Sequence, residues 1–232
     1  MKKNKLIAIT GGIGSGKSCV LSILNNAGYN TLSCDEITSQ LYQKRKTKLL
    51  LKKLFPSAVK GFFNPKINRQ EISRIVFSDK QQLALLTNAI TPLVLEEVKC
   101  QAKSLDGLVF VEVPLLFECN YQDQFDEIVV VKRSLKDRIE STKKRSNLTE
   151  EQIFDRINNQ VDYESLDLSK YIIIDNHGNI EGLSDKVLSI ARQIHRRLPH
   201  HKISTTRSTK ATNWTAHRRC SHCRNNRRTR VL

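Results

Sequence analysis

The chain has 232 residues, 39% of them hydrophobic, and a formal net charge of +16 at pH 7. This length allows one domain with a substantial core, with or without an appendage. The chain has no stretch of about 18 apolar residues that could span a membrane, no signal-peptide pattern and no disulfide framework, since its six cysteines are scattered. We therefore expect a cytoplasmic protein with reduced thiols and no membrane partner.

The positive charge is concentrated at the C-terminal end. Of the 39 basic residues, eleven lie from Arg196 onwards, where no Asp or Glu occurs. The first 195 residues therefore carry 28 basic and 23 acidic side chains, a net charge of +5. We accordingly divide the chain into a folded domain, residues 1–196, and a basic extension, residues 197–232.

The first predicted strand, residues 6–10, leads directly into the glycine-rich segment GGIGSGKS. Gly11, Gly16, Lys17 and Ser18 fit the pattern G-x-x-x-x-G-K-[ST], which is typical of a phosphate-binding loop between a strand and a helix. Glycines let successive backbone amides turn toward an anion. In such a loop Lys17 lies near the β- and γ-phosphates of a nucleoside triphosphate, and the Ser18 hydroxyl binds Mg²⁺. The residues expected to contact the nucleotide are Gly12, Gly14, Ser15, Gly16, Lys17, Ser18 and Cys19.

The rest of the domain alternates between strand and helix patterns. Further strands are predicted at 29–33, 108–113, 127–131 and 171–174, and helices at 19–26, 81–102 with an interruption at Pro92, 135–145, 150–160 and 182–198. Continuous apolar strands are typical of a parallel sheet that is buried on both faces. The alternation predicts a three-layer α/β domain of the P-loop NTPase type, with its ligand at the carboxyl ends of the strands.

Asp35 follows the second predicted strand, in the segment LSCDEITSQL. This position suits a base that orients or deprotonates an acceptor hydroxyl during phosphoryl transfer. Asp is also a favoured residue at the N-cap of a helix, and a helical pattern begins at Glu36. The residues alone leave both interpretations open.

Five segments together resemble the dephospho-coenzyme A kinase family: GGIGSGKS, CDEI, VPLLFE at 113–118, a basic helix pair ending in Gln160, and YIIIDN at 171–176. The resemblance covers about residues 5–195. It implies transfer of the γ-phosphoryl group of ATP to the ribose 3′-hydroxyl of dephospho-coenzyme A, the last step of coenzyme A synthesis. It also implies a helical substrate-binding region, a mobile lid and a catalytic role for Asp35.

The resemblance further implies that PLLFE forms the wall of the acceptor site. The residues concerned are Leu115, Leu116, Phe117 and Glu118; the alternative is that the apolar ones belong to the core. Thr91 departs from the family pattern, which commonly has His there, so an anion contact at this position would be weaker. Glu112 stands where Asp is frequent, and Cys19 where Thr is usual.

A lid at about residues 134–160 is also supported by the residues themselves. Ser134 and Thr149 each begin a capping-box pattern, which predicts the starts of two helices. Arg138 and Arg145 are seven residues apart and share a helix face, from which guanidinium groups could neutralise charge on the transferring phosphoryl group. The alternative is a solvated basic face.

The basic extension has no acidic residue and few aliphatic ones, so we expect it to be disordered and to take no part in the chemistry. Its Cys220 and Cys223 form one C-x-x-C pair without a second half-site for zinc. Contacts with nucleic acid are conceivable only through this extension. Two alternative functions stay open: a nucleoside or nucleotide kinase with a similar core, and a nucleic-acid-binding protein with a regulatory nucleotide site.

Overall fold

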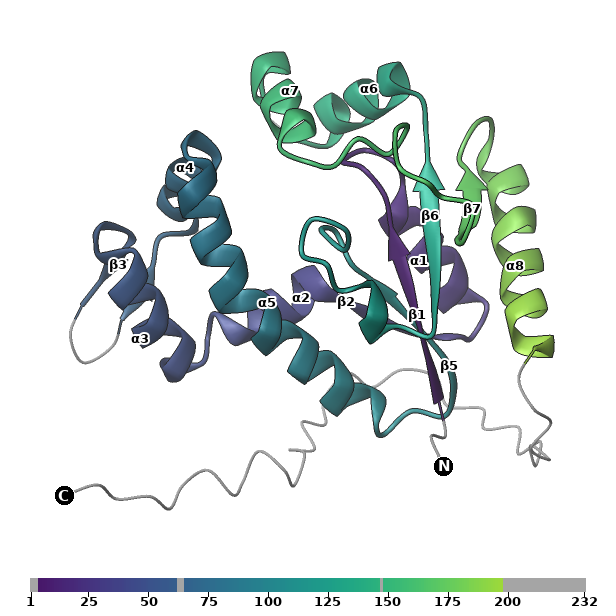
Figure 1. Ribbon diagram of the computed structural model, residues 1–232, viewed down its shortest axis with the longest axis horizontal. Helices are drawn as coiled ribbons and strands as arrows, with labels where there is room; N and C mark the ends of the chain where they lie inside the picture. The colour runs from purple at the N-terminus through teal and green to yellow at the C-terminus, as the bar shows by residue number, and fades with distance from the viewer. Residues whose placement is uncertain (1–3, 62–64, 147, 198–232) are drawn as a thin grey trace.

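The computed structural model describes residues 4–61, 65–146 and 148–197 (Figure 1). Its main sheet has the strand order β2-β5-β1-β6-β7, and every pair of neighbouring strands is parallel. The strands are β1 Asn4–Thr10, β2 Asn30–Ser33, β5 Gly107–Glu112, β6 Glu127–Lys132 and β7 Ile172–Asp175. The predicted parallel sheet is confirmed, and β1 lies at its centre.

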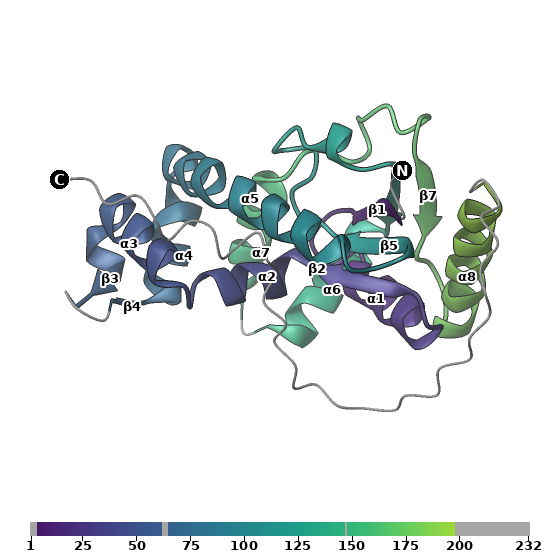
Figure 2. The same cartoon turned by 90° about the horizontal axis from the view of Figure 1, so that it is seen from below.

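The sheet is buried on both faces because successive side chains of each strand enter different cores. In β1, Ile7 and Ile9 belong to one core, and Leu6 and Ala8 belong to the other. Helices α1 and α8 close the first core, and α2 and α5 help to close the second (Figure 2). These helices span Lys17–Asn26, Ile180–Arg196, Cys34–Leu41 and Lys80–Ala102. The predicted three-layer arrangement is therefore confirmed.

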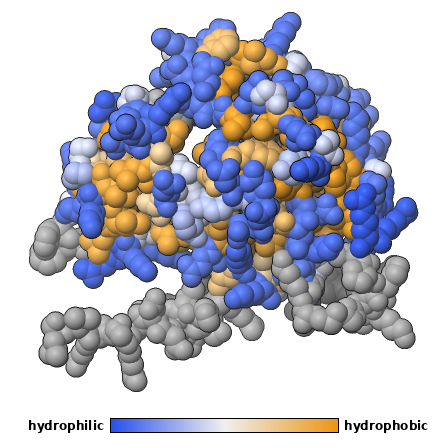
Figure 3. Space-filling model, in the orientation of Figure 1, coloured by the Kyte–Doolittle hydropathy of each residue, from blue (hydrophilic) through white to orange (hydrophobic). Residues whose placement is uncertain are grey.

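A helical lobe, built around residues 42–61 and 65–79, projects beyond the edge strand β2 (Figure 1). It contains the outer half of α5 and a core that includes Leu51, Phe55 and Ile72. Its other elements are α3 Arg45–Leu54, η1 Pro56–Ala58, β3 Val59–Lys60, β4 Lys66–Ile67 and α4 Arg69–Ser78. Figure 3 shows that the molecule is hollowed between this lobe and the body. None of these smaller elements was among the predicted ones.

Helix α5 runs without a break through Pro92, so the predicted interruption is wrong. Proline removes one backbone donor and crowds the preceding turn, which usually kinks or ends a helix. Here Ile90 before the proline and Val94 and Val98 after it are all buried in the same core. This burial on both sides holds the helix together despite the missing hydrogen bond.

Helices α6 Leu135–Arg145 and α7 Glu150–Asn158 lie in the predicted lid, a segment beyond the carboxyl ends of the strands (Figure 1). The backbone amide of Asp137 donates to the Ser134 hydroxyl at 3.2 Å, which caps α6. Thr149 and Gln152 make both hydrogen bonds of a capping box at the start of α7. The two predicted helix starts are thus confirmed, and α7 ends two residues earlier than predicted. A further short helix, η2, spans Gln122–Gln124.

Two findings bear on the expected partners. No helix within the described ranges is both long enough and apolar enough to cross a membrane. The same part of the chain contains no cluster of three or more His, Cys, Asp or Glu side chains that could hold a metal ion. The predictions for Cys220, Cys223 and nucleic-acid contacts concern residues outside the described ranges.

Candidate active site

The glycine-rich loop joins the central strand β1 to α1, as the motif predicts. Gly11, Gly14 and Gly16 have φ values of 146°, 75° and 99°, which L-amino acids with a side chain rarely adopt. Helix α1 begins at Lys17, two residues earlier than predicted, so its N-terminus opens directly onto the loop. Amides at a helix N-terminus and in such a loop attract phosphate groups.

The glycines also make room for neighbouring segments, which the sequence did not indicate. A Cβ atom on Gly12 would lie 2.3 Å from Nη2 of Arg138, and one on Gly14 would lie 2.3 Å from the Arg138 carbonyl oxygen. A Cβ atom on Gly16 would lie 2.2 Å from Nδ2 of Asn176. The loop is therefore glycine-rich partly because α6 and the segment after β7 pack directly against it.

Three side chains from distant segments bind the loop backbone. Arg138 Nε donates to the carbonyl oxygen of Ile13 at 2.9 Å, and the Ile13 amide donates to Gln160 Oε1 at 2.7 Å. Asn176 Nδ2 donates to the carbonyl oxygen of Ser15 at 2.8 Å. Gln160 and Asn176 were not among the predicted site residues; the only sequence signal for them was their place in segments that resemble the family.

Lys17 folds back over the loop. Its ammonium group donates to the carbonyl oxygens of Gly11 and Gly12 at 2.8 and 3.1 Å. Burial lowers the pKa of Lys17 from 10.5 to about 8, although the nearby charges of Glu112 and Asp35 act in the opposite direction. The ammonium is thus held at the loop and still predominantly charged at neutral pH.

Nucleotide affinity is expected to fall as the pH rises through about 8. The protonated form of Lys17 attracts the phosphates, and its lowered pKa means that this form is lost above about pH 8 rather than above its ordinary value of 10.5. Because affinity follows the protonated fraction, the Kd for ADP should be about tenfold higher at about pH 9 than at about pH 7. Calorimetric titration checks this. Lys17→Met should bind weakly and lack the step, and a flat profile for the unaltered chain would contradict the assignment.

Two acidic residues lie beside Lys17. Glu112, buried at the end of β5, accepts a hydrogen bond from the Ser18 hydroxyl at 2.9 Å. Burial raises the pKa of Glu112, and the Ser18 hydrogen bond and the Lys17 charge partly offset this effect. Asp35 is exposed in the first turn of α2 and interacts electrostatically with both Lys17 and Glu112. The loop hydroxyl and two carboxylates therefore converge at one edge of the sheet.

Asp35 is not the cap of α2. The N-cap is Ser33, whose side-chain oxygen accepts a hydrogen bond from the Glu36 amide at 3.4 Å. The capping interpretation of Asp35 is therefore wrong, because Asp35 already lies inside the helix. Its carboxylate faces solvent at the mouth of the sheet.

The PLLFE segment is divided between core and surface. Leu116 and Phe117 are buried, and the Phe117 ring packs against those of Tyr163 and Tyr171 with centroid distances of 5.8 and 5.3 Å. Leu115 is half-buried. This arrangement matches the packing interpretation for Leu116 and Phe117.

Glu118 ties the PLLFE segment to the end of the lid. Its Oε1 accepts a hydrogen bond from the Val161 amide at 3.1 Å, while its buried Oε2 has no hydrogen-bond partner among the described residues. Burial raises the pKa of Glu118. The neighbouring Cys119 shares a side-chain hydrogen bond with Thr91 of α5, so the departure at residue 91 faces this same segment.

The two lid arginines occupy different positions, although the sequence suggested similar roles. Arg138 is bound to the loop through Ile13. Arg145, the last residue of α6, is exposed, and its positive charge acts on both Lys17 and Glu112. Of the two, Arg138 is the one bound to the loop backbone. Arg145 can therefore turn toward a bound phosphate without breaking a contact with the loop.

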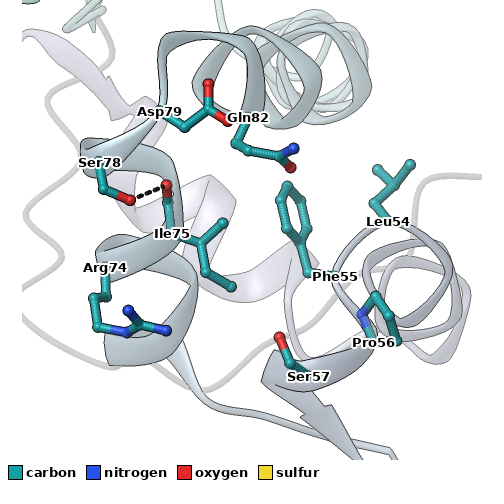
Figure 4. Close-up of a pocket in the computed structure, with 9 residues that line it drawn as sticks. All are labelled: Leu54, Phe55, Pro56, Ser57, Arg74, Ile75, Ser78, Asp79 and Gln82. Carbon is teal, nitrogen blue, oxygen red and sulfur yellow. Dashed lines mark hydrogen bonds between the residues drawn. The ribbon is translucent and has the colours of Figure 1, made fainter.

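A separate cavity of about 370 Å³ lies in the helical lobe (Figure 4). None of its lining residues comes from the phosphate-binding loop or the lid. Its polar groups are used locally: Arg74 binds Glu71 at 2.7 Å, Ser78 donates to the Ile75 carbonyl oxygen at 3.0 Å, and Asp79 accepts from the Gln81 amide at 2.7 Å. This cavity is therefore separate from the site at the phosphate-binding loop.

Comparison with known proteins points to one family. A family model described as dephospho-CoA kinase matches residues 5–182. The dephospho-CoA kinases of Thermus thermophilus and Bartonella henselae are 30% and 31% identical to this chain over 190 and 194 residues. Each alignment covers 82% of this chain, and they cover 91% and 98% of the respective relatives.

Solved structures agree with the fold. The crystal structure of TT1252 from Thermus thermophilus has a TM-score of 0.72 and 30% sequence identity, and the match covers 83% of this chain and 99% of that one. The dephospho-CoA kinase from Campylobacter jejuni has a TM-score of 0.54 at 24% identity, with 84% and 99% of the two chains covered. Because its identity is only 24%, the Campylobacter jejuni structure supports the fold alone.

Proposed function

Since this chain belongs to the dephospho-CoA kinase family, we propose that its loop, lid and acidic residues transfer the γ-phosphoryl group of ATP to the ribose 3′-hydroxyl of dephospho-CoA. The products are ADP and coenzyme A, so the reaction is the last step of coenzyme A synthesis. The observation that carries the assignment of residues is the convergence of Lys17, Ser18 and Asp35 at the carboxyl edge of the sheet, beneath the lid.

The donor side of the site is the phosphate-binding loop. Lys17 leaves the loop carbonyls and places its charge against the β- and γ-phosphates, while the inward-facing amides bind their oxygens. Gly12, Gly14, Ser15, Gly16, Lys17, Ser18 and Cys19 form this cradle. Arg145 reaches the transferring group from the end of α6, where it stabilises the negative charge of the transition state.

The residues beside the loop suit Mg²⁺. Ser18 Oγ and the Glu112 carboxylate are hard oxygen donors 2.9 Å apart, and Mg²⁺ is usually held by one or two such groups together with phosphate oxygens and water. Ser18 would bind the ion, and Glu112 would hold the Ser18 hydroxyl or a bound water in place. When bound, Mg²⁺ neutralises charge on the phosphates.

Asp35 acts on the acceptor. As the ribose 3′-oxygen forms its bond to the γ-phosphorus, the bond from that phosphorus to the bridging oxygen breaks and ADP leaves with the electron pair. The hydroxyl proton passes to the Asp35 carboxylate, which is exposed and lies within electrostatic range of Lys17. Leu115 and Glu118 line the acceptor site, and the buried Leu116 and Phe117 support them from the core.

A turnover assay tests the proposed function. Purified protein with ATP and Mg²⁺ should consume ATP rapidly with dephospho-CoA, and at least about 10²-fold more slowly with adenosine or nucleoside monophosphates, because those acceptors lack the remote groups whose binding positions the hydroxyl. Faster turnover of a nucleoside or a nucleotide would favour the alternative kinase, which the family match does not support. Absence of turnover with every acceptor would reject the assignment as an enzyme.

We also propose a cytoplasmic location, which the cysteines support. Cys19, Cys34, Cys100 and Cys119 are free thiols. Free thiols persist in a reducing compartment, so we place the protein in the cytoplasm. Nucleic-acid binding concerns only the basic extension, and no step of the proposed reaction uses it.

A further inference from the structure

The lid grips two consecutive peptide groups of the phosphate-binding loop. The peptide between Gly12 and Ile13 donates its N–H to Gln160 Oε1 at 2.7 Å. The next peptide, between Ile13 and Gly14, accepts a hydrogen bond from Arg138 Nε at 2.9 Å through its carbonyl oxygen. Gln160, after α7, thus binds the first peptide group, and Arg138, in α6, binds the second.

Peptide geometry determines what these two contacts do to the opposite side of the loop. The peptide bonds of the described residues are all trans, and in a planar trans peptide the N–H and C=O point in opposite directions. When Gln160 holds the Ile13 N–H, the Gly12 carbonyl must point the other way, and it does accept a hydrogen bond from the Lys17 ammonium at 3.1 Å. The first peptide therefore has its donor toward the lid and its acceptor toward the catalytic lysine.

The same reasoning applies to the second peptide. Because Arg138 holds the Ile13 carbonyl against α6, the Gly14 N–H must point away from the lid, into the concave side of the loop. No described residue accepts a hydrogen bond from this N–H. It is thus a donor that is already aimed at the position of the phosphates and has no competing partner.

Contacts within the loop fix only part of this orientation: the Ser15 amide and the Lys17 ammonium donate to the Gly12 carbonyl oxygen at 3.2 and 3.1 Å, but among the described residues no contact within the loop holds the second peptide. Gly12 and Gly14 flank Ile13, and glycine accepts many backbone conformations at little cost, so both peptide groups could rotate if nothing held them. Gln160, in contrast, is fixed on both sides. Its own amide donates to the Ile157 carbonyl oxygen at 3.0 Å at the end of α7, and the next amide, that of Val161, is bound by Glu118.

We propose that Gln160 is a positioning residue that, together with Arg138, orients the two Ile13 peptide groups so that the Gly14 N–H is presented to the β- and γ-phosphates. The proposal rests on the proposed function only in naming the phosphates as the ligand. Gln160 itself touches no reacting atom, because its side chain acts through the Ile13 amide.

Two substitutions at this residue separate positioning from packing. Gln160→Met keeps the length of the side chain but has no acceptor for the Ile13 amide, so the Kd for Mg·ADP and the KM for ATP should rise about five- to tenfold, the equivalent of about one hydrogen bond. The KM for dephospho-CoA should change less than the KM for ATP. Gln160→Glu keeps an oxygen acceptor at the same place and should retain the wild-type orientation of the loop in the nucleotide-free protein.

A spectroscopic readout does not depend on activity. The chain has nine glycines, so protein labelled with ¹⁵N-glycine gives few amide signals. The Gly14 signal of the nucleotide-free protein should shift or broaden in Gln160→Met and stay in place in Gln160→Glu. If Gln160→Met does not fold, as judged by its thermal unfolding, Gln160→Asn, which is one methylene shorter and cannot reach Ile13, takes its place.

Gln152→Met is the matched control. It makes the same chemical change within the lid, at the start of α7, where Gln152 belongs to the capping box and not to the loop contact. An equal rise in the KM for ATP with this control, or an unchanged Gly14 signal and ADP affinity in Gln160→Met, would overturn the proposal. If the unaltered chain fails to phosphorylate dephospho-CoA, the proposed function fails, while the Gly14 signal still decides whether Gln160 orients the loop.

Discussion

Replacement of Asp35 by Asn is expected to lower kcat with dephospho-CoA by about 10²- to 10⁴-fold and to leave ATP affinity within about twofold. The amide has nearly the same shape as the carboxylate but cannot take the proton of the acceptor hydroxyl. Asp35 lies in α2 and contributes no hydrogen bond to the phosphate-binding loop, so the donor site should keep its geometry. Steady-state kinetics together with ADP titration measure both quantities.

Glu36 provides the matched control for Asp35. It is also exposed in the first turn of α2, so Glu36→Gln removes one negative charge from the same turn. This variant should keep wild-type turnover. Wild-type turnover in Asp35→Asn would remove Asp35 from the mechanism, and an equal loss in both variants would indicate a general effect of charge rather than a proton acceptor.

Replacement of Gly14 by Ala should reduce kcat/KM by at least about 10²-fold, since a displacement of about 1 Å at a reacting group can have an effect of this size. The new methyl group would lie 2.3 Å from the Arg138 carbonyl oxygen and 2.7 Å from Thr142 Oγ1. Gly14 also has a φ of 75°, a conformation that strains alanine by roughly 1–2 kcal/mol. The lid helix and the loop cannot both keep their positions. Kinetics and thermal unfolding report the two effects.

Gly12→Ala is the informative comparison because its collision is of another kind. The new methyl group would meet the guanidinium end of Arg138, 2.3 Å away, and this group sits on a flexible side chain. The loss of activity should therefore be smaller than in Gly14→Ala, and it should nearly vanish when Gly12→Ala is added to an Arg138→Ala background. Equal losses in the two glycine variants would show that the packing of α6 against the loop does not determine these positions.

Most of the sheet could be predicted because its strands carry their own signal. Continuous apolar runs such as residues 108–113 and 127–131 indicate burial on both faces, and the structure confirms them as β5 and β6. Helix α3, with the sequence RKTKLLLKKL, lacks such a signal, because the two residues that it buries fully are Thr47 and Leu51. The predicted helix break at Pro92 was wrong for a related reason. The lost hydrogen bond is a local effect that the sequence shows, whereas the packing that compensates for it comes from other elements.

The candidate site likewise contains some residues that the sequence could predict and some contacts that it could not. Lys17 and Ser18 stand in a short motif whose chemistry can be inferred from residue type and spacing, whereas the role predicted for Asp35 depended on the resemblance to the family. The contacts of Gln160 and Asn176 with the loop join residues 147 and 161 positions apart, and they exist only because the lid and the segment after β7 fold back over β1. A polar residue just beyond the end of a helix or a strand gives no indication of such a distant partner, so these contacts could not be inferred without the structure.

The hydrogen bond between Glu118 and the Val161 amide has a consequence for how the two substrates influence each other. Val161 is adjacent to Gln160, so a short stretch of backbone links the acceptor wall to the loop that holds ATP. If occupation of one place shifts this stretch, thermodynamic reciprocity requires that each substrate change the affinity of its companion by the same factor. A positive coupling of this kind would favour the ternary complex over either binary complex and so limit the futile hydrolysis of ATP by water.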